Sequence, residues 1–243
     1  MRTGMIEAHL AKLRARDEIS AAEEQAIRSA VTETKEVPAD HTIIRAGELL
    51  STSTLLLEGI MCRYKDLRNG QRQITELHVA GDFVDLHSFT LKRLDHNVEA
   101  LTPCRLAVVP HENLEAITEQ HPHLTRVYWF GTNLDAAIHR EWELSLGRRT
   151  ASARLAALFC EMQVRLQIVG LADANSYDFP LTQTDLAECL GLTNVHVNRT
   201  LKGLRDQGLV TFQAGRVTIG NMAGLRRTGE FDPSYLYLEP RQR

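Results

Sequence analysis

Cysteine is scarce in this chain of 243 residues. The four cysteines lie far apart and form no Cys-x-x-Cys pair; they are Cys62, Cys104, Cys160 and Cys189. Such spacing lacks the paired ligands of a zinc or iron–sulfur site and the dense framework of a disulfide-rich secreted domain. We therefore predict no metal site, and we expect the four thiols to be buried as small hydrophobic groups.

Long apolar runs are absent as well. Lys12, Arg14 and Arg16 interrupt the opening segment, which is thus unlike the unbroken apolar core of a signal peptide. No later stretch approaches the roughly 20 apolar residues that a membrane-spanning helix needs. We therefore expect a cytoplasmic protein without a membrane partner.

Catalytic motifs are missing too. The chain contains no Walker loop, no Gly-x-Ser-x-Gly elbow and no His-Glu-x-x-His helix. With 43% hydrophobic and 24% charged residues, the composition is nevertheless that of a folded globular protein. We therefore expect a binding protein and not an enzyme.

The net charge of −3 does not indicate a nucleic-acid partner, but the charges are unevenly distributed. Residues 1–148 contain 17 basic and 22 acidic side chains, whereas residues 149–243 contain 11 and 9. Between Leu192 and Arg227 there are six basic residues and one acidic residue, Asp206. A basic segment of this kind is typical of surfaces that contact phosphates, although it also fits an ordinary solvated face.

The first half of the chain has the pattern of a β domain, preceded by a helical segment that ends near Val31. Short apolar runs separated by turn signals predict strands over residues 42–44, 54–57, 60–65, 73–79, 98–101 and 105–109. Asn69-Gly70 favours a type I′ hairpin, because both residues tolerate positive φ. Strands this short and closely spaced favour an antiparallel roll or sandwich.

From Pro110 the apolar period changes to that of helices, with a short helix to about residue 119, a long one over 122–148 and another over 150–168. Small or apolar residues of the long helix recur at spacings of three and four; they are Leu124, Val127, Gly131, Leu134 and Ile138. This seam fits either packing against the helix's own domain or a parallel coiled-coil dimer in which Gly131 permits close approach.

The most informative stretch predicts two helices joined by a tight turn. Thr182 can cap a first helix, Gly191 permits the turn, and Thr193 can cap a second helix through about residue 207. The apolar residues of the two helices can pack together, which directs the opposite face of the second helix to solvent. This is the arrangement of a helix-turn-helix whose second helix enters the major groove of DNA.

The outward face of the second helix has side chains suited to bases and phosphates. Arg199 can donate two hydrogen bonds to guanine, Asn194 or Asn198 can pair with adenine, and Val195 can pack on a thymine methyl. Lys202 suits a phosphate, as does Arg216 in a predicted two-stranded wing over 209–213 and 216–219. The predicted DNA-contacting residues are Thr193, Asn194, Val195, His196, Asn198, Arg199, Lys202 and Arg216. A helical hairpin followed by a β-hairpin without a DNA-binding role is the alternative.

The order of roll, long helix and winged motif, with the segment LTQTDLAECLGLTNVHVNRTLKGLRDQGLV, resembles the Crp/Fnr family of bacterial transcription regulators. The resemblance implies an α+β fold with three parts. These are a cyclic-nucleotide-binding-like antiparallel β roll with flanking helices as the sensor domain (1–120), a dimerisation helix (121–148) and a winged helix-turn-helix DNA-binding domain (149–243). It implies two partners, double-stranded DNA and a second copy of the chain, and the second copy would bind through the five-residue seam. RNA polymerase is a further candidate partner. Arg199 matches the family's recognition-helix arginine, whereas Val195 replaces a glutamate of well-studied members.

The sensor departs from the family pattern. Members that bind cyclic nucleotides use a Gly-Glu-Leu turn followed by an Arg-Ser or Arg-Thr pair. This chain instead has Gly81-Asp82-Phe83-Val84-Asp85-Leu86 and later Asp95-His96-Asn97-Val98, with a shifted Arg93 nearby. We therefore expect no cyclic-nucleotide binding, and the effector stays unknown. Residues 1–61 contain no cysteine, which excludes the iron–sulfur cluster of the oxygen-sensing branch.

The ten histidines suggest a haem or metal site only weakly, because none is arranged with defined ligand spacing; those considered are His87, His96, His121 and His123. We therefore predict no cofactor. The expected function is sequence-specific DNA binding by a homodimeric transcription regulator on an inverted-repeat operator. The alternative is a protein-interaction module with a degenerate winged helix domain, which salt-dependent binding to palindromic DNA would distinguish.

Overall fold

The computed structural model describes residues 6–241 and contains two compact units. One unit comprises Met1–Lys65, Leu77–Ala136 and Tyr237–Arg243, and the other Asp66–Glu76 and Ala137–Leu236. None of the helices in the described range has the length and apolarity needed to span a bilayer. The predicted α+β fold, with an antiparallel roll and a winged helix-turn-helix, is confirmed.

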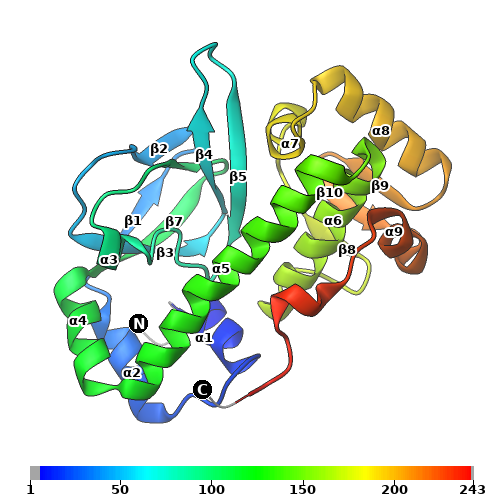
Figure 1. Ribbon diagram of the computed structural model, residues 1–243. Coiled ribbons are helices and arrows are strands. Elements are labelled where there is room, and N and C mark those ends of the chain that lie inside the picture. The colour runs from blue at the N-terminus through cyan, green and yellow to red at the C-terminus, as the bar shows by residue number, and fades with distance from the viewer. Residues whose placement is uncertain (1–5, 242–243) are drawn as a thin grey trace. The chain divides into compact units, whose positions relative to one another are not determined.

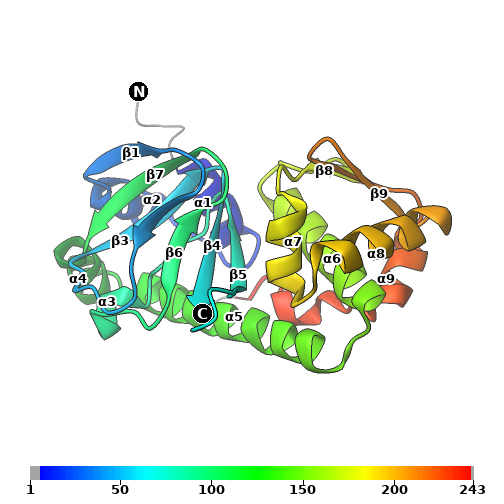
Figure 2. The ribbon, with the colours of Figure 1, turned by 90° about the horizontal axis from the view of Figure 1, so that it is seen from above.

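Two antiparallel sheets form the roll (Figures 1 and 2). The first has the order β1-β7-β3, with bounds Glu33–Val37, Cys104–Pro110 and Thr52–Glu58. The second has the order β2-β6-β4-β5, with bounds His41–Ile44, Asn97–Ala100, Ile60–Asp66 and Arg72–Val79. The six predicted strands are present. The sequence pattern misses β1 because four of its five residues are exposed and no apolar alternation results.

The core of the roll follows from the alternation of side chains along the strands. Leu55 and Leu57 of β3 pack into a cluster with residues of the flanking helices, among them Leu124. Leu56, between them, points to the other side and packs with Met61 and other residues of the second sheet. All four cysteines are buried, as predicted, and all four are free thiols.

The single helical segment predicted before Val31 is wrong, because the structure has two helices, α1 (Glu7–Arg14) and α2 (Ala21–Ala30). Ser20 begins the second: its hydroxyl accepts a hydrogen bond from the Glu23 backbone N–H at 3.3 Å, and its own N–H donates to the Glu23 carboxylate at 2.9 Å. This capping box starts a new helix and turns the chain.

Three further helices follow in the chain, one between β5 and β6 and two after β7. They are α3 (Ser88–Leu91), α4 (His111–Gln120) and α5 (Pro122–Arg148). The bounds of α5 agree with the predicted long helix. Its residues up to Ala136 belong to the first unit and those from Ala137 to the second.

The second unit is built around α6 (Ala151–Ile168), which packs against α8 and α9. A three-stranded sheet of order β8-β10-β9 completes it (Figure 2). The remaining elements are β8 (Ser176–Asp178), α7 (Gln183–Leu190), α8 (Asn194–Asp206), β9 (Val210–Gln213), β10 (Arg216–Ile219), α9 (Met222–Gly229) and the 3₁₀ helix η1 (Pro233–Leu236). Rings of Phe159, Phe179 and Phe212 pack together in the core.

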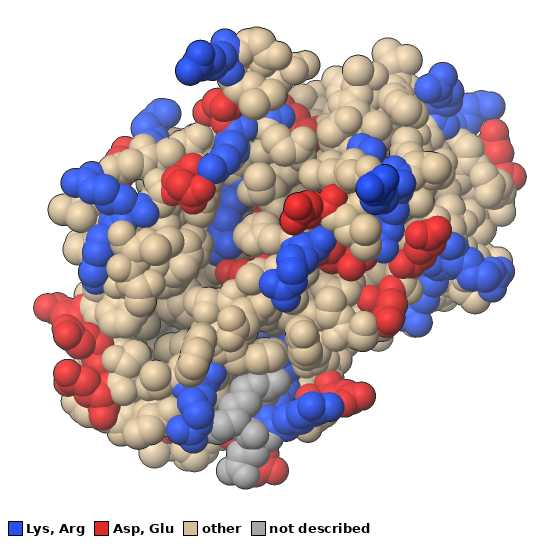
Figure 3. Space-filling view, in the orientation of Figure 1, with Lys and Arg blue, Asp and Glu red and all other residues tan. Residues whose placement is uncertain are grey.

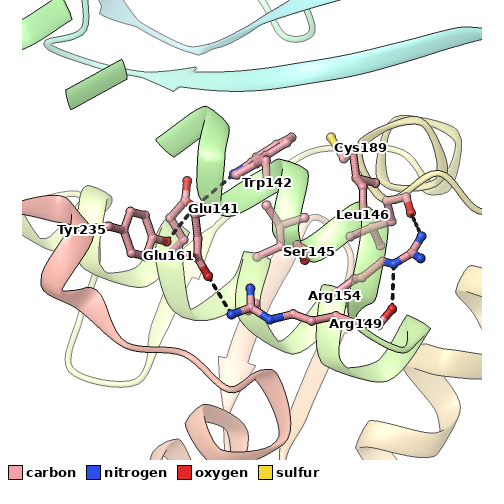
Figure 4. A pocket seen from close by; sticks show the side chains of 12 residues that line it. Glu141, Trp142, Ser145, Leu146, Arg149, Arg154, Glu161, Cys189 and Tyr235 are labelled. Carbon is pink, nitrogen blue, oxygen red and sulfur yellow. Dashed lines mark hydrogen bonds and ion pairs between the residues drawn. The ribbon is translucent and has the colours of Figure 1, made fainter. Parts of the chain in front are cut away.

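A buried carboxylate ties three helices of this unit together beside a cavity of about 370 Å³ (Figure 4). Glu161 of α6 accepts hydrogen bonds from the Trp142 indole of α5 at 3.0 Å and from the Tyr235 hydroxyl of η1 at 2.8 Å. Its other oxygen accepts from Arg165 at 2.9 Å. Burial and the adjacent Glu161 raise the pKa of Tyr235, which keeps the hydroxyl as a donor.

Replacing Glu161 with Leu should lower the free energy of unfolding of this unit by about 3–5 kcal/mol, because the buried groups of Trp142, Tyr235 and Arg165 lose the carboxylate to which they donate. Urea unfolding followed by circular dichroism measures the loss. The matched control is Glu143→Leu, an exposed position on α5, which should change stability by no more than about 0.5 kcal/mol. Equal losses in the two variants would contradict the assigned role of Glu161.

Candidate DNA-binding surface

The predicted helix-turn-helix is formed by α7 and α8. The Thr182 hydroxyl accepts from the Asp185 N–H at 3.1 Å while the Asp185 carboxylate accepts from the Thr182 N–H at 2.7 Å, so α7 begins with a complete capping box. Gly191 ends α7 with φ of +60°, a conformation that favours glycine. Thr193 caps α8, accepting from the His196 N–H at 3.3 Å. These caps fix where the second helix starts.

One face of α8 is buried and the other is fully open to solvent. Val197 and Leu204 are completely buried against the rest of the unit. On the opposite side Arg199 and Lys202 are exposed, and Val195 is 79% exposed. An apolar side chain so exposed at the start of a helix is available to a partner, and a thymine methyl is one such partner.

The two basic residues of this face differ in their surroundings. Within the described chain, Arg199 makes no hydrogen bond or ion pair. Lys202 pairs with Asp206 one turn later, at 3.1 Å between Nζ and Oδ2. Basic side chains are visible over α8, with acidic ones close by (Figure 3). Arg199 can therefore contact a partner without losing an existing bond, whereas Lys202 must first give up its ion pair with Asp206.

Two residues that the sequence interpretation missed position the asparagines of α8. The Asn194 amide donates to the Thr184 hydroxyl at 3.1 Å, and the Asn198 amide donates to the Gln183 carbonyl oxygen at 2.6 Å. Gln183 and Thr184 form the first turn of α7, immediately after its cap, and that position is the signal that could have identified them. The contacts orient both amides before any partner binds.

The wing is present, but Arg216 is bound within it. β9 and β10 pair antiparallel and are joined by Ala214 and Gly215, both with positive φ as a type I′ turn requires. Arg216 donates to Asp178 at 2.6 Å and to Asp173 at 3.0 Å. Its charge is thus already paired with two carboxylates, which weakens its predicted role at a phosphate.

The predicted dimer seam lies on the side of α5 that packs within the chain. Leu124, Val127 and Ile138 are at most 3% exposed. Leu134 and Gly131 are half-buried and line a cavity of the first unit. In the structure the seam therefore packs against the chain itself, one of the two arrangements that its spacing allows. Its side chains have little exposed surface left for a second copy.

The Gly81–Asp82 turn is covered by α1. A Cβ on Gly81 would lie 2.6 Å from the backbone carbonyl of Ala8, and Lys12 forms an ion pair with Asp82. Arg93 donates to the Gly47 carbonyl at 2.5 Å. The Gly81–Asp82 turn thus has its contacts with α1, and the shifted arginine bonds to Gly47 at the surface.

The histidines singled out in the sequence do not gather into one site. The rings of His87 and His96 lie 5.2 Å apart, and His96 pairs with Asp95. His123 instead contacts Asp17 and Glu23. Within residues 6–241, no group of three or more His, Cys, Asp or Glu side chains could hold a metal ion.

Comparison with known proteins agrees with this architecture. Residues 34–121 match the model of a cyclic nucleotide-binding domain, and residues 153–228 match that of a Crp-like helix-turn-helix domain. A probable transcriptional activator of Rhizobium leguminosarum bv. viciae is 31% identical over 196 residues, which cover 79% of this chain and 80% of the relative. The activator FnrL of Cereibacter sphaeroides is 28% identical over 186 residues, or 74% and 73% of the two chains.

A solved structure is similar over most of the chain. FixK2 from Bradyrhizobium japonicum superposes with a TM-score of 0.75 at 27% identity, covering 82% of this chain and 97% of that one. The first of the two relatives passes 30% identity over four fifths of its own length, and the two matched domains occur in the expected order. The chain therefore belongs to the Crp/Fnr family of transcription regulators.

Proposed function

We propose that this protein regulates transcription by binding double-stranded DNA through α8, as a homodimer on an inverted-repeat operator. The observation that carries the proposal is the outward face of α8, where Val195, Arg199 and Lys202 stand exposed while the opposite face is buried. The complete caps and the formed wing give no support to a degenerate winged helix. The activators among its relatives support a regulatory role.

The exposed side of α5 is the proposed contact between the two copies. An α-helix turns 100° per residue, so Trp129 and Gly147 lie on the same side of α5. Ile138 lies about 180° away, on the opposite side. Trp129 is 68% exposed, and Asn133 and Arg140 continue the exposed stripe at spacings of four and seven. An exposed tryptophan on a long helix is typical of an interface residue. We therefore propose that the two copies contact each other through this stripe and not through the buried seam.

DNA reading by α8 is tested by comparing Arg199→Ala with Lys202→Ala. Arg199→Ala should cost about 1–3 kcal/mol on the selected operator and remove the preference at one base pair, because a bidentate base contact is lost. Lys202→Ala should weaken binding to operator and scrambled DNA alike and reduce the salt slope by about one.

Binding titrations at several salt concentrations, on both DNAs, separate these outcomes. Arg205→Ala, another exposed basic position on α8 outside the predicted contact set, is the control for general loss of charge. If Arg199→Ala weakened both DNAs equally and left the base preference unchanged, Arg199 would not lie at a base edge.

Dimerisation through the stripe is tested by Trp129→Glu. The substitution places two carboxylates opposite each other at the proposed interface and should shift the protein from dimer toward monomer in sedimentation at micromolar concentration. Leu171→Glu, a matched change at a residue 52% exposed in a loop, should leave the dimer intact. A parent protein that sediments as a monomer, or a Trp129→Glu variant that remains fully dimeric, would contradict the placement.

The proposed regulation does not use cyclic nucleotides. Supporting observations are the covering of Gly81 by α1, the pairing of Asp82 with Lys12, and the engagement of Arg93 with Gly47. Calorimetry with cyclic AMP should therefore show no saturable binding at micromolar concentration. Saturable binding that also tightens operator binding would overturn this part of the proposal.

A further inference from the structure

The roll unit contains a cavity that DNA binding does not use. It lies between α1, the segment from Gly81 to Leu86 and the part of α5 from Val127 to Asp135, which are neighbouring elements in Figure 1. It has a volume of about 650 Å³, part of it open to solvent. Its apolar lining includes Leu13, Phe83, Leu86, Tyr128, Phe130 and Leu134.

The aromatic side of the cavity is held in a fixed geometry. The rings of His9 and Phe83 lie 5.3 Å apart at an interplanar angle of 89°, and those of Phe83 and Tyr128 lie 5.8 Å apart at 80°. Such edge-to-face packing is favourable for aromatic pairs. The close approach of Ala8 to Gly81 holds α1 against the same turn. The rings are thus ordered before any ligand arrives.

His9 brings an unsatisfied acceptor to this cavity. The residue is 5% exposed, and its Nδ1 lies 2.9 Å from the Gly81 carbonyl oxygen. A carbonyl only accepts, so Nδ1 carries the hydrogen and Nε2, on the other side of the ring, has the lone pair. Burial lowers the pKa of His9 to about 4, which keeps the ring neutral near pH 7. Nε2 has no hydrogen-bond partner among the described residues.

Tyr128 provides a second polar group. Tyr128 is 8% exposed, and burial raises the pKa of its hydroxyl well above the usual range. The hydroxyl makes no hydrogen bond with any residue in the described range. A ligand that accepts from this hydroxyl would gain a hydrogen bond within the cavity. His9 and Tyr128 therefore favour a ligand with a hydroxyl group.

The five charged residues of the lining already have polar partners, and Arg16 donates to the Lys12 carbonyl oxygen at 3.1 Å. Lys12 pairs with Asp82, and Asp135 accepts from Arg63 at 3.0 Å. Asp17 lies 3.3 Å from the His123 ring nitrogen. An anionic or cationic ligand would have to break such a pair to find a counter-charge. The cavity is therefore suited to an uncharged molecule.

We propose that this cavity is a binding site for an uncharged, flat aromatic compound that bears a hydroxyl group, with His9 Nε2 accepting the hydroxyl hydrogen and the rings of Phe83 and Tyr128 packing on the ligand. The site does not depend on the proposed DNA-binding function. It lies on the side of α5 opposite the Trp129 stripe.

The experiment compares two probes of the same size, 2-naphthol and 2-methylnaphthalene, by fluorescence titration of the full chain without DNA. The expected result is saturable binding of one 2-naphthol per chain at micromolar concentration, at least tenfold tighter than 2-methylnaphthalene. His9→Phe should remove that tenfold difference, because the ring stays and the acceptor is lost. Equal affinities of the parent protein for the two probes would overturn the assigned role of His9.

A cavity-filling variant keeps the proposal testable if His9→Phe fails to fold. A Cβ at Gly131 meets no atom within 4 Å, so Gly131→Leu can place its side chain in the cavity without disturbing the helix. It should abolish binding of both probes. Gly203→Leu, the same change at another helical glycine with open space, should bind 2-naphthol as the parent does. Unchanged binding by Gly131→Leu, or no saturable binding by the parent, would overturn the site.

Discussion

The burial of one side of α8 is the constraint on which the DNA-binding surface depends. α8 packs against α6 and α7 through Val197, Thr200 and Leu204, all buried. Once these side chains point inward, helical geometry directs Val195 and Arg199 outward. The caps at Thr182 and Thr193 and the left-handed Gly191 set the start and angle of the helix. The network around Glu161 supports the same unit by joining α6 to the end of α5 and to η1.

A similar division between two faces gives α5 two roles. Its inward side, with Leu124, completes the core of the roll and, with Gly131 and Leu134, lines the cavity. Its outward side carries Trp129 and the proposed contact with a second copy. A ligand in the cavity would thus touch the same helix that carries the proposed contact with a second copy.

The sequence predicts much of this structure, and the failures have identifiable physical reasons. Caps, glycine turns and apolar periods are local signals, so the bounds of α5, α7 and α8 and the six strands of the roll could be found. The strand β1 could not, because an exposed edge strand has no apolar alternation. Periodicity identified the apolar seam of α5, but it does not say whether the neighbour is the chain's own core or a second copy. The charge of Arg216 and its place in the predicted wing indicate a phosphate contact, whereas its carboxylate partners come from β8 and the loop before it, which are distant in sequence.

The central claim is that two copies of α8, related by a twofold axis, read DNA together. Selection of binding sites from a pool of random duplex DNA with the full chain tests it most directly. Reading by two such helices should enrich an inverted repeat whose half-site centres are about 34 Å apart, one helical turn of DNA. Enrichment of a single unrepeated site, or no enrichment above the starting pool at moderate salt, would contradict it.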